Sequence, residues 1–550
     1  MNGRKDGTRR SMLLPAAQPD HPTCFNQHRG VRSTVFEIMN LLILFTVLSS
    51  TLFHTTASAQ SSQNATTFAL LYGYPLLAWQ NYYAPIINEV GANTWYHNRN
   101  LQTAADREVV KPNVDTLYSN LVYDLPIQNI EITIPDIPAD EFKLFSFYDP
   151  YGVNYANVGT SGFYKPGKYL IKPYNRGNGN SAVGLTNSTS SRYVGVVNTP
   201  NFYGTILVRW GATSSNLPQI HKYQDACSAF LVPTPDAIVG PAAPPLLQSL
   251  IPVYNDSALP APNVLNLLVA FEPPNPPPQL AAAGISAWNH SYTPPPNVDL
   301  DLANATALRQ ALATTILPST NKALNNNWTL LAPSTLGIYG DDYALRAAVS
   351  LSGYLALRAP FAIYPTFNNV SASNPGNAGV IFLEADEAVL LTFSGKPPVD
   401  SQAGFWSLTA YGGDLGSYHL VPNERDVYAL GDRSNLTYPN GGRVYGGNST
   451  GEEFQILLQP ADVPPPANWT SNWLPAPSGG GNVVPQLRFY GAEEPLEEGT
   501  YVYPKVEKIG VITGQGVTVP ATGAGSSVDV VGGSVVAAVV CVLACVVLLG

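Results

Sequence analysis

The chain has 550 residues, which is enough for two to four domains that each bury a core. Only 12% of its residues are charged and 45% are hydrophobic, so the composition excludes an intrinsically disordered chain. Residues 1–59 carry six basic and three acidic side chains, so the remainder carries −10 − 3 = −13, and this acidic balance argues against binding to nucleic acid.

The amino end has the features of a secretory signal. An apolar run begins at Met39 and ends at residues 57–59 in Ala-Ser-Ala, a small-x-small pattern that precedes signal cleavage. We therefore expect residues 39–59 to be a signal peptide. Residues 1–38 have two interpretations, a long basic n-region or a non-native extension upstream of a start at Met39, and we favour the second. An uncleaved signal anchor is the alternative to both.

Residues 60–213 are predicted to form a first domain. Its opening stretch, 67–90, has apolar residues at helical spacing. From Leu117 onward, short β-rich runs alternate with Pro, Gly, Asn and Asp, a cadence typical of a β-sandwich or barrel.

Residues 214–377 are predicted to be a Pro-rich and partly helical connecting region. Helical spacing recurs at 263–271 and 305–317, and Asp341 can cap a further helix. Cys227 is the only cysteine between the predicted signal and the tail, so we expect no disulfide within the mature ectodomain.

Residues 378–507 are predicted to form a second β-rich domain, because apolar and aromatic runs recur there at the spacing of a sandwich or jelly roll. The expected fold class is therefore mainly β (α+β). It consists of two β-sandwich or jelly-roll-like domains joined by the partly helical, Pro-rich segment.

The carboxyl end is typical of a glycolipid-anchor signal. Residues 508–534 form a stalk with small residues at 523–525, and residues 535–550 form a hydrophobic tail that ends in Gly550. We expect attachment at Gly523 and a place on the outer face of the plasma membrane or in the cell wall of a eukaryote. A short membrane helix is the alternative.

Ten Asn-x-Ser/Thr sequons fit a glycoprotein of the secretory pathway. They are Asn64, Asn187, Asn255, Asn289, Asn304, Asn327, Asn369, Asn435, Asn448 and Asn468.

Long motifs in both β-rich regions resemble a two-domain family of unknown function, which consists of the domains of unknown function 1254 and 1214. The resemblance covers about residues 68–507. The motifs that resemble the first domain are His97, 110–119, 123–125, 148–151, Asn154 and 158–159, and those that resemble the second are 396–398, 404–409, Tyr411, 423–425, 472–477 and 487–490. The resemblance implies no particular activity.

Four residues of the first domain are candidates for catalysis: His97, Asn113, Asp115 and Tyr118. An extended Asn-x-Asp segment places both side chains on one face, and His97 could meet them across a turn. Imidazole and carboxylate can ligate a divalent metal or act as a base and its orienting partner. The alternative is that Asn113 and Asp115 shape an Asx turn or a cap.

Five residues of the second domain are candidates for ligand binding: Trp406, Tyr411, Arg425, Trp473 and Arg488. Aromatic faces stack on sugar rings and arginine binds carboxylates with two hydrogen bonds, so such a cleft would suit an acidic sugar or another carboxylated ligand. The alternative is that the alternating strands bury these aromatic residues.

Three functions remain open. The first is an extracellular hydrolase with a metal-assisted or acid/base site, in which case a divalent metal is the candidate cofactor. The second is a surface protein that binds a glycan or a small carboxylated ligand. The third is a structural wall protein without catalysis. The expected partners are the membrane, through the anchor, and a glycan or small ligand, and we expect no nucleic acid.

Overall fold

The computed structural model describes residues 62–514, except 108, 176–180, 235–259, 272–275, 287–290, 294, 296–297, 316, 369–378, 415–416 and 447–450. These residues belong to one compact unit of the chain, Gln60–Gly550. The predicted signal peptide (39–59), anchor site (Gly523) and tail (535–550) lie outside the described residues. So do the sequons at Asn255, Asn289, Asn369 and Asn448.

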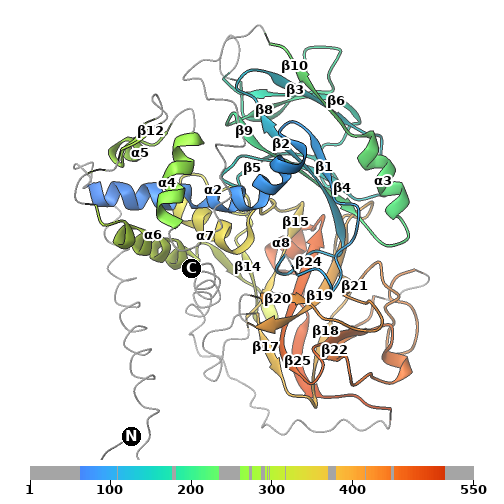
Figure 1. Ribbon diagram of the computed structural model, residues 1–550. Coiled ribbons are helices and arrows are strands. Elements are labelled where there is room, and N and C mark those ends of the chain that lie inside the picture. Colours follow the sequence, from blue (N-terminus) through green and yellow to red (C-terminus); the bar gives the residue numbers. More distant parts are fainter. Residues whose placement is uncertain are drawn as a thin grey trace, which may run out of the picture. The chain divides into compact units, whose positions relative to one another are not determined.

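The first β region consists of two packed five-stranded sheets (Figure 1). The first sheet has the order β1-β2-β9-β4-β5: Trp95–His97, Thr116–Asp124, Tyr203–Gly211, Lys143–Tyr148 and Asn154–Gly159. The second has the order β10-β3-β6-β8-β7: Ser228–Val232, Asn129–Ile134, Gly167–Pro173, Gly195–Thr199 and Gly184–Asn187. Apolar residues such as Leu121, Ile132 and Phe145 form one core between them. Helix α3 (Leu217–Ala226) packs beside this core through Ile220.

The second β region also has two layers. Its larger sheet has the order β13-β14-β16-β24-β19-β20, and β15, β17 and β21 pair with β24 or β19. The strands are Asn321–Ala323, Trp328–Leu331, Thr366–Phe367, Gly481–Tyr490, Phe405–Asp414, Ser417–Leu420, Ala362–Ile363, Ile381–Leu383 and Ala429–Gly431. The smaller sheet, β23-β22-β18-β25, consists of Trp473–Ala476, Phe454–Pro460, Glu387–Phe393 and Lys505–Gly510. One core that includes Trp406 and Phe489 lies between the layers.

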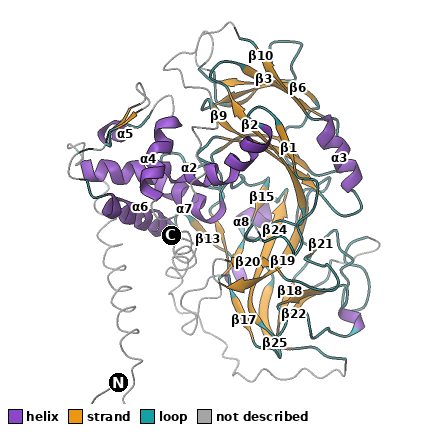
Figure 2. Ribbon diagram, in the orientation of Figure 1, coloured by secondary structure: helices purple, strands orange, loops and turns teal. Residues whose placement is uncertain are grey.

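A helical layer flanks both β regions (Figure 2). It consists of α2 (Ser62–Val90), α4 (Pro260–Ala270), α5 (Pro278–Ala282), α6 (Leu300–Thr314) and α7 (Tyr343–Gly353). Short elements β11 (Ile285–Ser286) and β12 (Ser291–Tyr292) pair beside it, and α8 (Glu494–Glu498) follows β24. Helix α2 therefore packs with the helices of the connecting region, although it precedes the first β region in sequence.

The prediction of a mainly β fold is confirmed. The first sheets extend past residue 213, because β10 pairs with β3, and β13–β16 join the second region before residue 378. The cap of α7 is Asp342 and not the predicted Asp341, because the Asp342 side chain accepts a hydrogen bond from the Leu345 N–H at 2.9 Å. Among the described residues, no helix is both long enough and apolar enough to cross a membrane.

The two β regions meet through aromatic side chains. The Phe142 ring, next to β4, lies edge-on to Phe405 of β19 at 5.1 Å, and Phe405 stacks on Tyr490 of β24 at 4.4 Å. All three residues are at least nine-tenths buried. This apolar junction fixes the end of β24 against the first sheet, which is where the candidate site lies.

Candidate functional site

Strand β2 presents two chemically different faces. Alternation along the strand places Tyr118 and Asn120 on one face and Ser119 and Leu121 on the other. The neighbouring strand β9 places Arg209 directly opposite Tyr118. The Ser119 face points into the core between the two sheets of the first region, and the Tyr118 face points toward α2 and the junction with the second region.

The Ser119 face holds a hydrogen-bond network around the Ser119 hydroxyl that includes His97. The Ser119 hydroxyl accepts from Trp210 Nε1 at 2.8 Å and from Gln224 Nε2 at 3.2 Å, and it lies 2.7 Å from His97 Nδ1. Because the oxygen already accepts twice, its own proton goes to Nδ1, so the imidazole is neutral with its proton on Nε2. Burial, and then the Arg99 charge, lower the pKa of His97 to about 4, which agrees with a neutral ring.

The predicted catalytic residues are therefore not brought together as one group. His97 bonds the Ser119 side of β2, whereas Asn113 and Tyr118 bond each other on the opposite side. Ser119 is fully buried, so the Ser119–His97 pair does not present a nucleophile to solvent. The pair orients side chains within the core.

Asn113 forms the predicted Asx turn and also contacts two phenols. Its Oδ1 accepts from the Asp115 backbone N–H at 2.7 Å, which fixes the orientation of the amide. Its Nδ2 then donates to the hydroxyls of Tyr118 at 3.0 Å and Tyr490 at 2.6 Å. Tyr490 in turn hydrogen-bonds Tyr364. The phenols accept from Asn113, so their own protons point to other acceptors.

Asp115 connects the first β region with the second. Its carboxylate accepts from the Ser407 hydroxyl at 2.5 Å and from the Arg433 guanidinium at 3.2 Å, and 5% of the residue is exposed. The carboxylate is therefore occupied by partners from the second region and has a structural role.

Two of the predicted ligand-binding residues also lie at this junction. Arg488 donates to Thr409 Oγ1 at 2.9 Å and to the Tyr411 hydroxyl. Tyr411 is fully buried and donates to the Pro112 carbonyl at 2.6 Å. These contacts place the Arg488 guanidinium beside the Asn113 turn.

The other three predicted ligand-binding residues lie elsewhere. Trp406 is 1% exposed and donates to the Tyr445 hydroxyl within the core of the second region. The Arg425 guanidinium lies 5.2 Å from the Trp473 ring and donates to the Thr470 carbonyl at 2.8 Å. The five residues thus do not line one cleft, because strand alternation sends Trp406 into the core.

Arg209 is the residue that the sequence analysis missed. It is 6% exposed, and its guanidinium lies 6.0 Å from the centroid of the Tyr118 ring. Its hydrogen bonds to the Tyr148 hydroxyl and the Leu355 carbonyl are both 3.4 Å long. Within the described part of the chain, no carboxylate oxygen lies within 4.0 Å of the Arg209 or Arg488 guanidinium. The available signal was an arginine in an otherwise apolar strand, TILVRW.

Accessible tyrosines border Arg209 and form a recess. Tyr82 is 42% exposed and Tyr364 is 37% exposed. Nevertheless burial, and then the Tyr118 phenol, raise the pKa of Tyr82 to about 12, and burial also raises the pKa of Tyr364. A phenol that is accessible and yet surrounded by protein lies in a recess and not on a convex surface.

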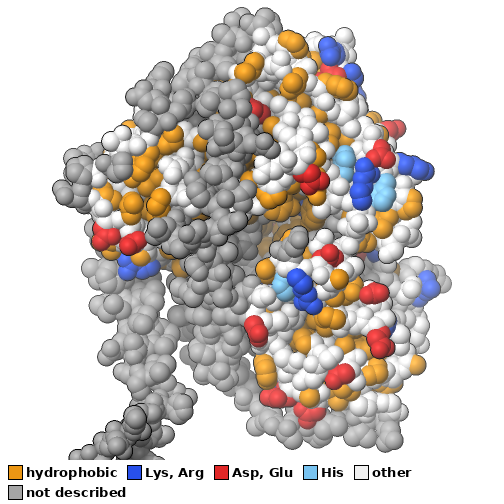
Figure 3. Space-filling view, viewed as in Figure 1, with side chains coloured by type: hydrophobic (Ala, Val, Ile, Leu, Met, Phe, Trp, Pro, Cys, Tyr) orange, Lys and Arg blue, Asp and Glu red, His pale blue; other side chains and the backbone are white. Residues whose placement is uncertain are grey.

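We call this feature the tyrosine recess and define it by Tyr82, Tyr96, Tyr118, Arg209 and Tyr364. In Figure 3 the surface is hollowed between the region of β1 and the region of β19, and side chains of the class that includes tyrosine line the hollow. The hydrogen-bond donors at its base, the donor cluster, are Asn113, Tyr118, Arg209, Tyr364, Arg488 and Tyr490.

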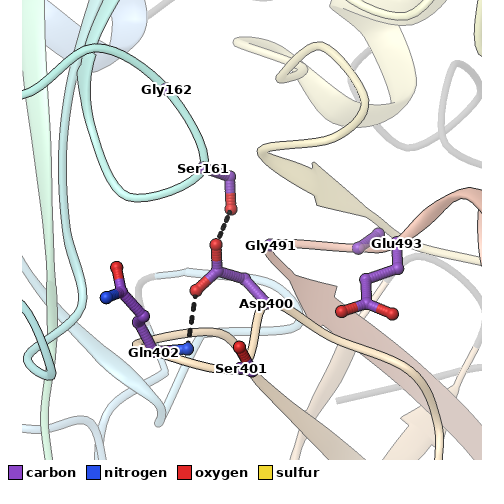
Figure 4. Close-up of a pocket in the computed structure, with 8 residues that line it drawn as sticks. Ser161, Gly162, Asp400, Ser401, Gln402, Gly491 and Glu493 are labelled. Carbon is purple, nitrogen blue, oxygen red and sulfur yellow. Dashed lines mark hydrogen bonds between the residues drawn. The ribbon is translucent and has the colours of Figure 1, made fainter.

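A second hollow lies nearby, between the β5–β6 loop and the second region (Figure 4). Its volume is about 550 Å³, and its lining includes Ser161, Asp400, Gln402 and Glu493. Asp400 accepts from the Ser161 hydroxyl at 3.4 Å and from the Gln402 backbone N–H at 3.0 Å. Its carboxylates are acceptors, so this hollow has the opposite chemistry to the donor cluster.

The described residues offer no ready metal site. No group of three or more His, Cys, Asp or Glu side chains within them is placed to hold a metal ion. Of the candidate ligands, His97 is bonded to Ser119 and Asp115 to Ser407 and Arg433. A divalent metal at these residues stays an untested prediction.

Five of the six described sequons are exposed: Asn64, Asn187, Asn327, Asn435 and Asn468. Asn304 is half-buried, and its side-chain oxygen accepts from the Tyr74 hydroxyl. Glycosylation at Asn304 would have to break this contact, whereas the exposed five could carry glycan without disturbing the core.

Comparisons with known proteins agree with this architecture. Residues 92–229 match the model of DUF1254, and residues 378–494 match the model of DUF1214, both described as proteins of unknown function. No curated protein is detectably similar to the chain in sequence.

Two solved structures are similar. The crystal structure of the VPA0106 protein from Vibrio parahaemolyticus covers 82% of this chain and 100% of its own, with 16% identity and a TM-score of 0.55. A putative uncharacterized protein from Burkholderia cenocepacia covers 83% of this chain and 92% of its own, with 13% identity and a TM-score of 0.36. At these identities the first likeness concerns the fold alone. The chain is a two-domain protein of unknown function, and it combines DUF1254 with DUF1214.

Proposed function

We propose that this protein binds a small organic carboxylate in the tyrosine recess. The observation that carries the proposal is the surplus of donors over acceptors at its base. The Asn113 amide donates to the hydroxyls of Tyr118 and Tyr490, and Tyr490 in turn hydrogen-bonds Tyr364. The hydroxyl protons of Tyr118 and Tyr364, at the two ends of this series of hydrogen bonds, remain to be donated. A carboxylate supplies acceptors only, and it would complete the network.

The charges around the donor cluster point the same way. Arg209 and Arg488 are each 6% exposed, and among the described residues neither guanidinium has a carboxylate oxygen within 4.0 Å. Arg433 is exposed and is already paired with Asp115 at 3.2 Å, so it adds nothing to the buried unpaired charge. A buried positive charge is costly unless it is paired, and an anionic ligand would pair it.

Binding is supported better than hydrolysis by the placement of the polar groups. A hydrolase with His97 as the base would need an accessible nucleophile beside it, and Ser119 is fully buried. The accessible Tyr364 phenol and the guanidinium groups of Arg209 and Arg488 beneath it instead favour recognition of an anion. A wall protein without a ligand would have no use for the unpaired donors.

We propose further that the protein is secreted and held at the cell surface by a glycolipid. The sequence patterns at residues 39–59 and 523–550 support this location, and the exposed sequons support passage through the secretory pathway. Phosphatidylinositol-specific phospholipase C should release the protein from intact cells. Retention in the membrane after this treatment would contradict the anchor and favour a membrane helix.

Calorimetric titration of the purified full-length chain tests the ligand proposal. Acetate, benzoate and glucuronate would be the probes, and at least one should bind with one-to-one stoichiometry. Arg209→Met should weaken binding on the order of 30-fold or more, because the carboxylate loses a buried charged partner. Tyr364→Phe, which removes one accessible hydroxyl and should not disturb folding, should weaken it about fivefold.

Arg443→Met is the matched control, because Arg443 is an exposed arginine outside the recess. Its affinity should equal that of the wild type. No binding of any of the three probes, or equal binding by the wild type and Arg209→Met, would overturn the proposed function.

A further inference from the structure

Two arginines of the donor cluster, Arg209 on β9 and Arg488 on β24, are buried without an anionic partner. Among the described residues no carboxylate oxygen lies within 4.0 Å of either guanidinium. Arg209 donates only to neutral oxygens, the Tyr148 hydroxyl and the Leu355 carbonyl, both at 3.4 Å, and its Nε has no hydrogen-bond partner. The Arg209 guanidinium therefore has both a charge and a donor to offer to an anion.

The partners of Arg488 are a separate set. Its guanidinium donates to Thr409 Oγ1 at 2.9 Å, to the Tyr411 hydroxyl, and to the Lys111 carbonyl at 3.4 Å. These bonds use three of its five N–H donors, and all three acceptors are again neutral oxygens. In the described part of the chain, none of these residues is a hydrogen-bond partner of Arg209. The two guanidinium groups are thus held apart by different residues, which favours two anionic positions over one.

A series of contacts leads from the Arg209 position toward the second β region. The Arg209 guanidinium lies 6.0 Å from the centroid of the Tyr118 ring, and the Tyr118 hydroxyl accepts from Asn113 Nδ2 at 3.0 Å. The same Nδ2 donates to the Tyr490 hydroxyl at 2.6 Å. Tyr490 lies on β24, two residues after Arg488, so alternation places both side chains on one face of that strand.

The Arg488 position lies beside an accessible ring. The Arg488 guanidinium is 6.0 Å from the centroid of the Tyr364 ring, and the Tyr364 ring lies edge-on to that of Tyr490 at 6.0 Å. Tyr364 is 37% exposed. A ligand can therefore approach over Tyr364 with one end toward Arg488, while the hydrogen-bonded series leads on to Arg209.

The backbone is strained at both positions. Leu355, whose carbonyl accepts from Arg209, has a φ of 65°, and Lys111, whose carbonyl accepts from Arg488, has a φ of 50°. Left-handed backbone is unfavourable for residues with a β-carbon, and it is concentrated where a structure holds groups for a ligand. The same device at both guanidinium groups supports a pair of equivalent positions.

We infer that the ligand is an organic dicarboxylate, with one acid group bound at Arg209 and the other at Arg488. The inference rests on the proposed function and deepens it. Each carboxylate would neutralise one buried guanidinium and accept from the N–H donors that the protein leaves unused.

Calorimetric titration of the full-length chain with matched acids tests the inference. Succinate and butyrate have the same chain length, as do glutarate and valerate, so each pair differs by one carboxylate. At least one diacid should bind on the order of 30-fold more tightly than its matched monoacid, because it gains a second buried charged partner.

Variants of Arg488 locate the second acid group. Arg488→Met should remove the advantage of the diacid and leave the affinity for the monoacid unchanged. Arg488→Lys keeps the charge but not the two-point geometry of the guanidinium, so it should reduce the advantage about fivefold, and it decides the question if Arg488→Met does not fold. Arg443→Met, at an exposed site outside the recess, is the control and should keep the full advantage.

The outcomes separate the two proposals. Equal binding of diacid and monoacid in both pairs would mean a ligand with one acid group, and the carboxylate site at Arg209 would stand. An advantage that both Arg488 variants retain would place the second acid elsewhere and overturn the inference. Inorganic phosphate that binds as tightly as the better diacid would indicate one doubly charged anion and overturn it as well. If neither the diacids nor the monoacids bind, the proposed function fails and the inference fails with it.

Discussion

The two faces of β2 differ in how their polar groups are hydrogen-bonded, although the residues of both faces alternate along one strand. On the Ser119 face, the partners Trp210, Gln224 and His97 use the hydroxyl fully. On the Tyr118 face, Asn113 uses the phenol as an acceptor, and Arg209 has only two long hydrogen bonds. Both faces hold buried polar groups, but only the second holds a buried charged donor, Arg209, without a carboxylate oxygen within 4.0 Å among the described residues.

Burial and a perturbed pKa therefore do not by themselves distinguish a structural cluster from a binding site. His97 has a lowered pKa and is held in the hydrogen-bond network around the Ser119 hydroxyl. Arg209 would have been overlooked by a search for histidines and carboxylates. What separates the two cases is charge: the donors of the Ser119 face are neutral, whereas the buried Arg209 guanidinium lacks an anionic partner among the described residues.

Substitutions on the two faces should differ in how much stability they cost. Ser119→Ala leaves the donors of Trp210 and Gln224 without their acceptor, so it should lower the free energy of unfolding by about 3 kcal/mol. Arg209→Met removes a buried unpaired charge, and the Leu355 carbonyl keeps its bond from Tyr148, so it should change stability by less than about 1 kcal/mol. Urea unfolding of both variants measures this.

An equal loss of unfolding free energy in Ser119→Ala and Arg209→Met would contradict the difference between the two faces. Arg443→Met serves as the baseline for the loss of an arginine at an exposed site.

A bound carboxylate should stabilise the folded protein through the Tyr118 face. At a ligand concentration of 100 times the Kd, the free energy of unfolding should rise by about 2.7 kcal/mol, because the ligand binds only the native state. Thermal unfolding with and without benzoate measures the effect. At the same ligand concentration Arg209→Met, whose affinity is expected to be on the order of 30-fold weaker, should show a rise of less than about 1 kcal/mol, whereas a rise of the same size as in the wild type would place the ligand elsewhere.

The Ser119 face should instead respond to pH. The folded-state pKa of His97 is about 4, below its ordinary value of 6.5, so the unfolded chain binds the proton first as the pH falls. The contribution of His97 is complete above pH 6.5 and is lost between pH 6.5 and 4. After discounting for partial exposure we expect a loss of about 1–2 kcal/mol.

The control for this effect is His97→Gln, which has no titrating ring. Asp149 and Asp432 have raised pKa values, about 6 and about 7, and their protonation in the folded state opposes the loss in the same pH range. The difference in unfolding free energy between wild type and His97→Gln, measured from pH 7.5 to 4.5, isolates the ring. A difference that does not vary with pH would contradict the hydrogen-bond network around the Ser119 hydroxyl.

The sequence predicted the fold class better than the site. Alternating apolar runs predicted strands such as β2 and β24, and helical spacing predicted α2, α4 and α6, because those patterns follow from local geometry. Asn113 and Arg488 were singled out as candidates, but the bonds from Asn113 to Tyr490 and from Arg488 to Lys111, each across 377 positions, depend on how the two regions pack. No local pattern encodes that contact.

The site prediction was wrong where it grouped residues that lie on opposite faces of one strand. His97 was grouped with Asn113 and Asp115 because they are close in sequence, yet β1 pairs His97 with Ser119, whose side chain points the other way from Tyr118. Arg209 carried no motif, and its proposed role rests on the lack of a carboxylate oxygen within 4.0 Å among the described residues. An absence of this kind becomes visible only when the three-dimensional neighbours are known.

The smallest expected effect is the sharpest test of the donor surplus. Tyr118→Phe removes a hydroxyl that accepts from Asn113, whose Nδ2 keeps its bond to Tyr490, so stability should change by only about 0.5 kcal/mol. Because the Tyr118 proton is free to reach the ligand, the same variant should bind benzoate about fivefold more weakly, as measured by calorimetry. Unchanged affinity together with a large loss of stability would mean that the Tyr118 hydroxyl, like that of Ser119, is used fully within the protein.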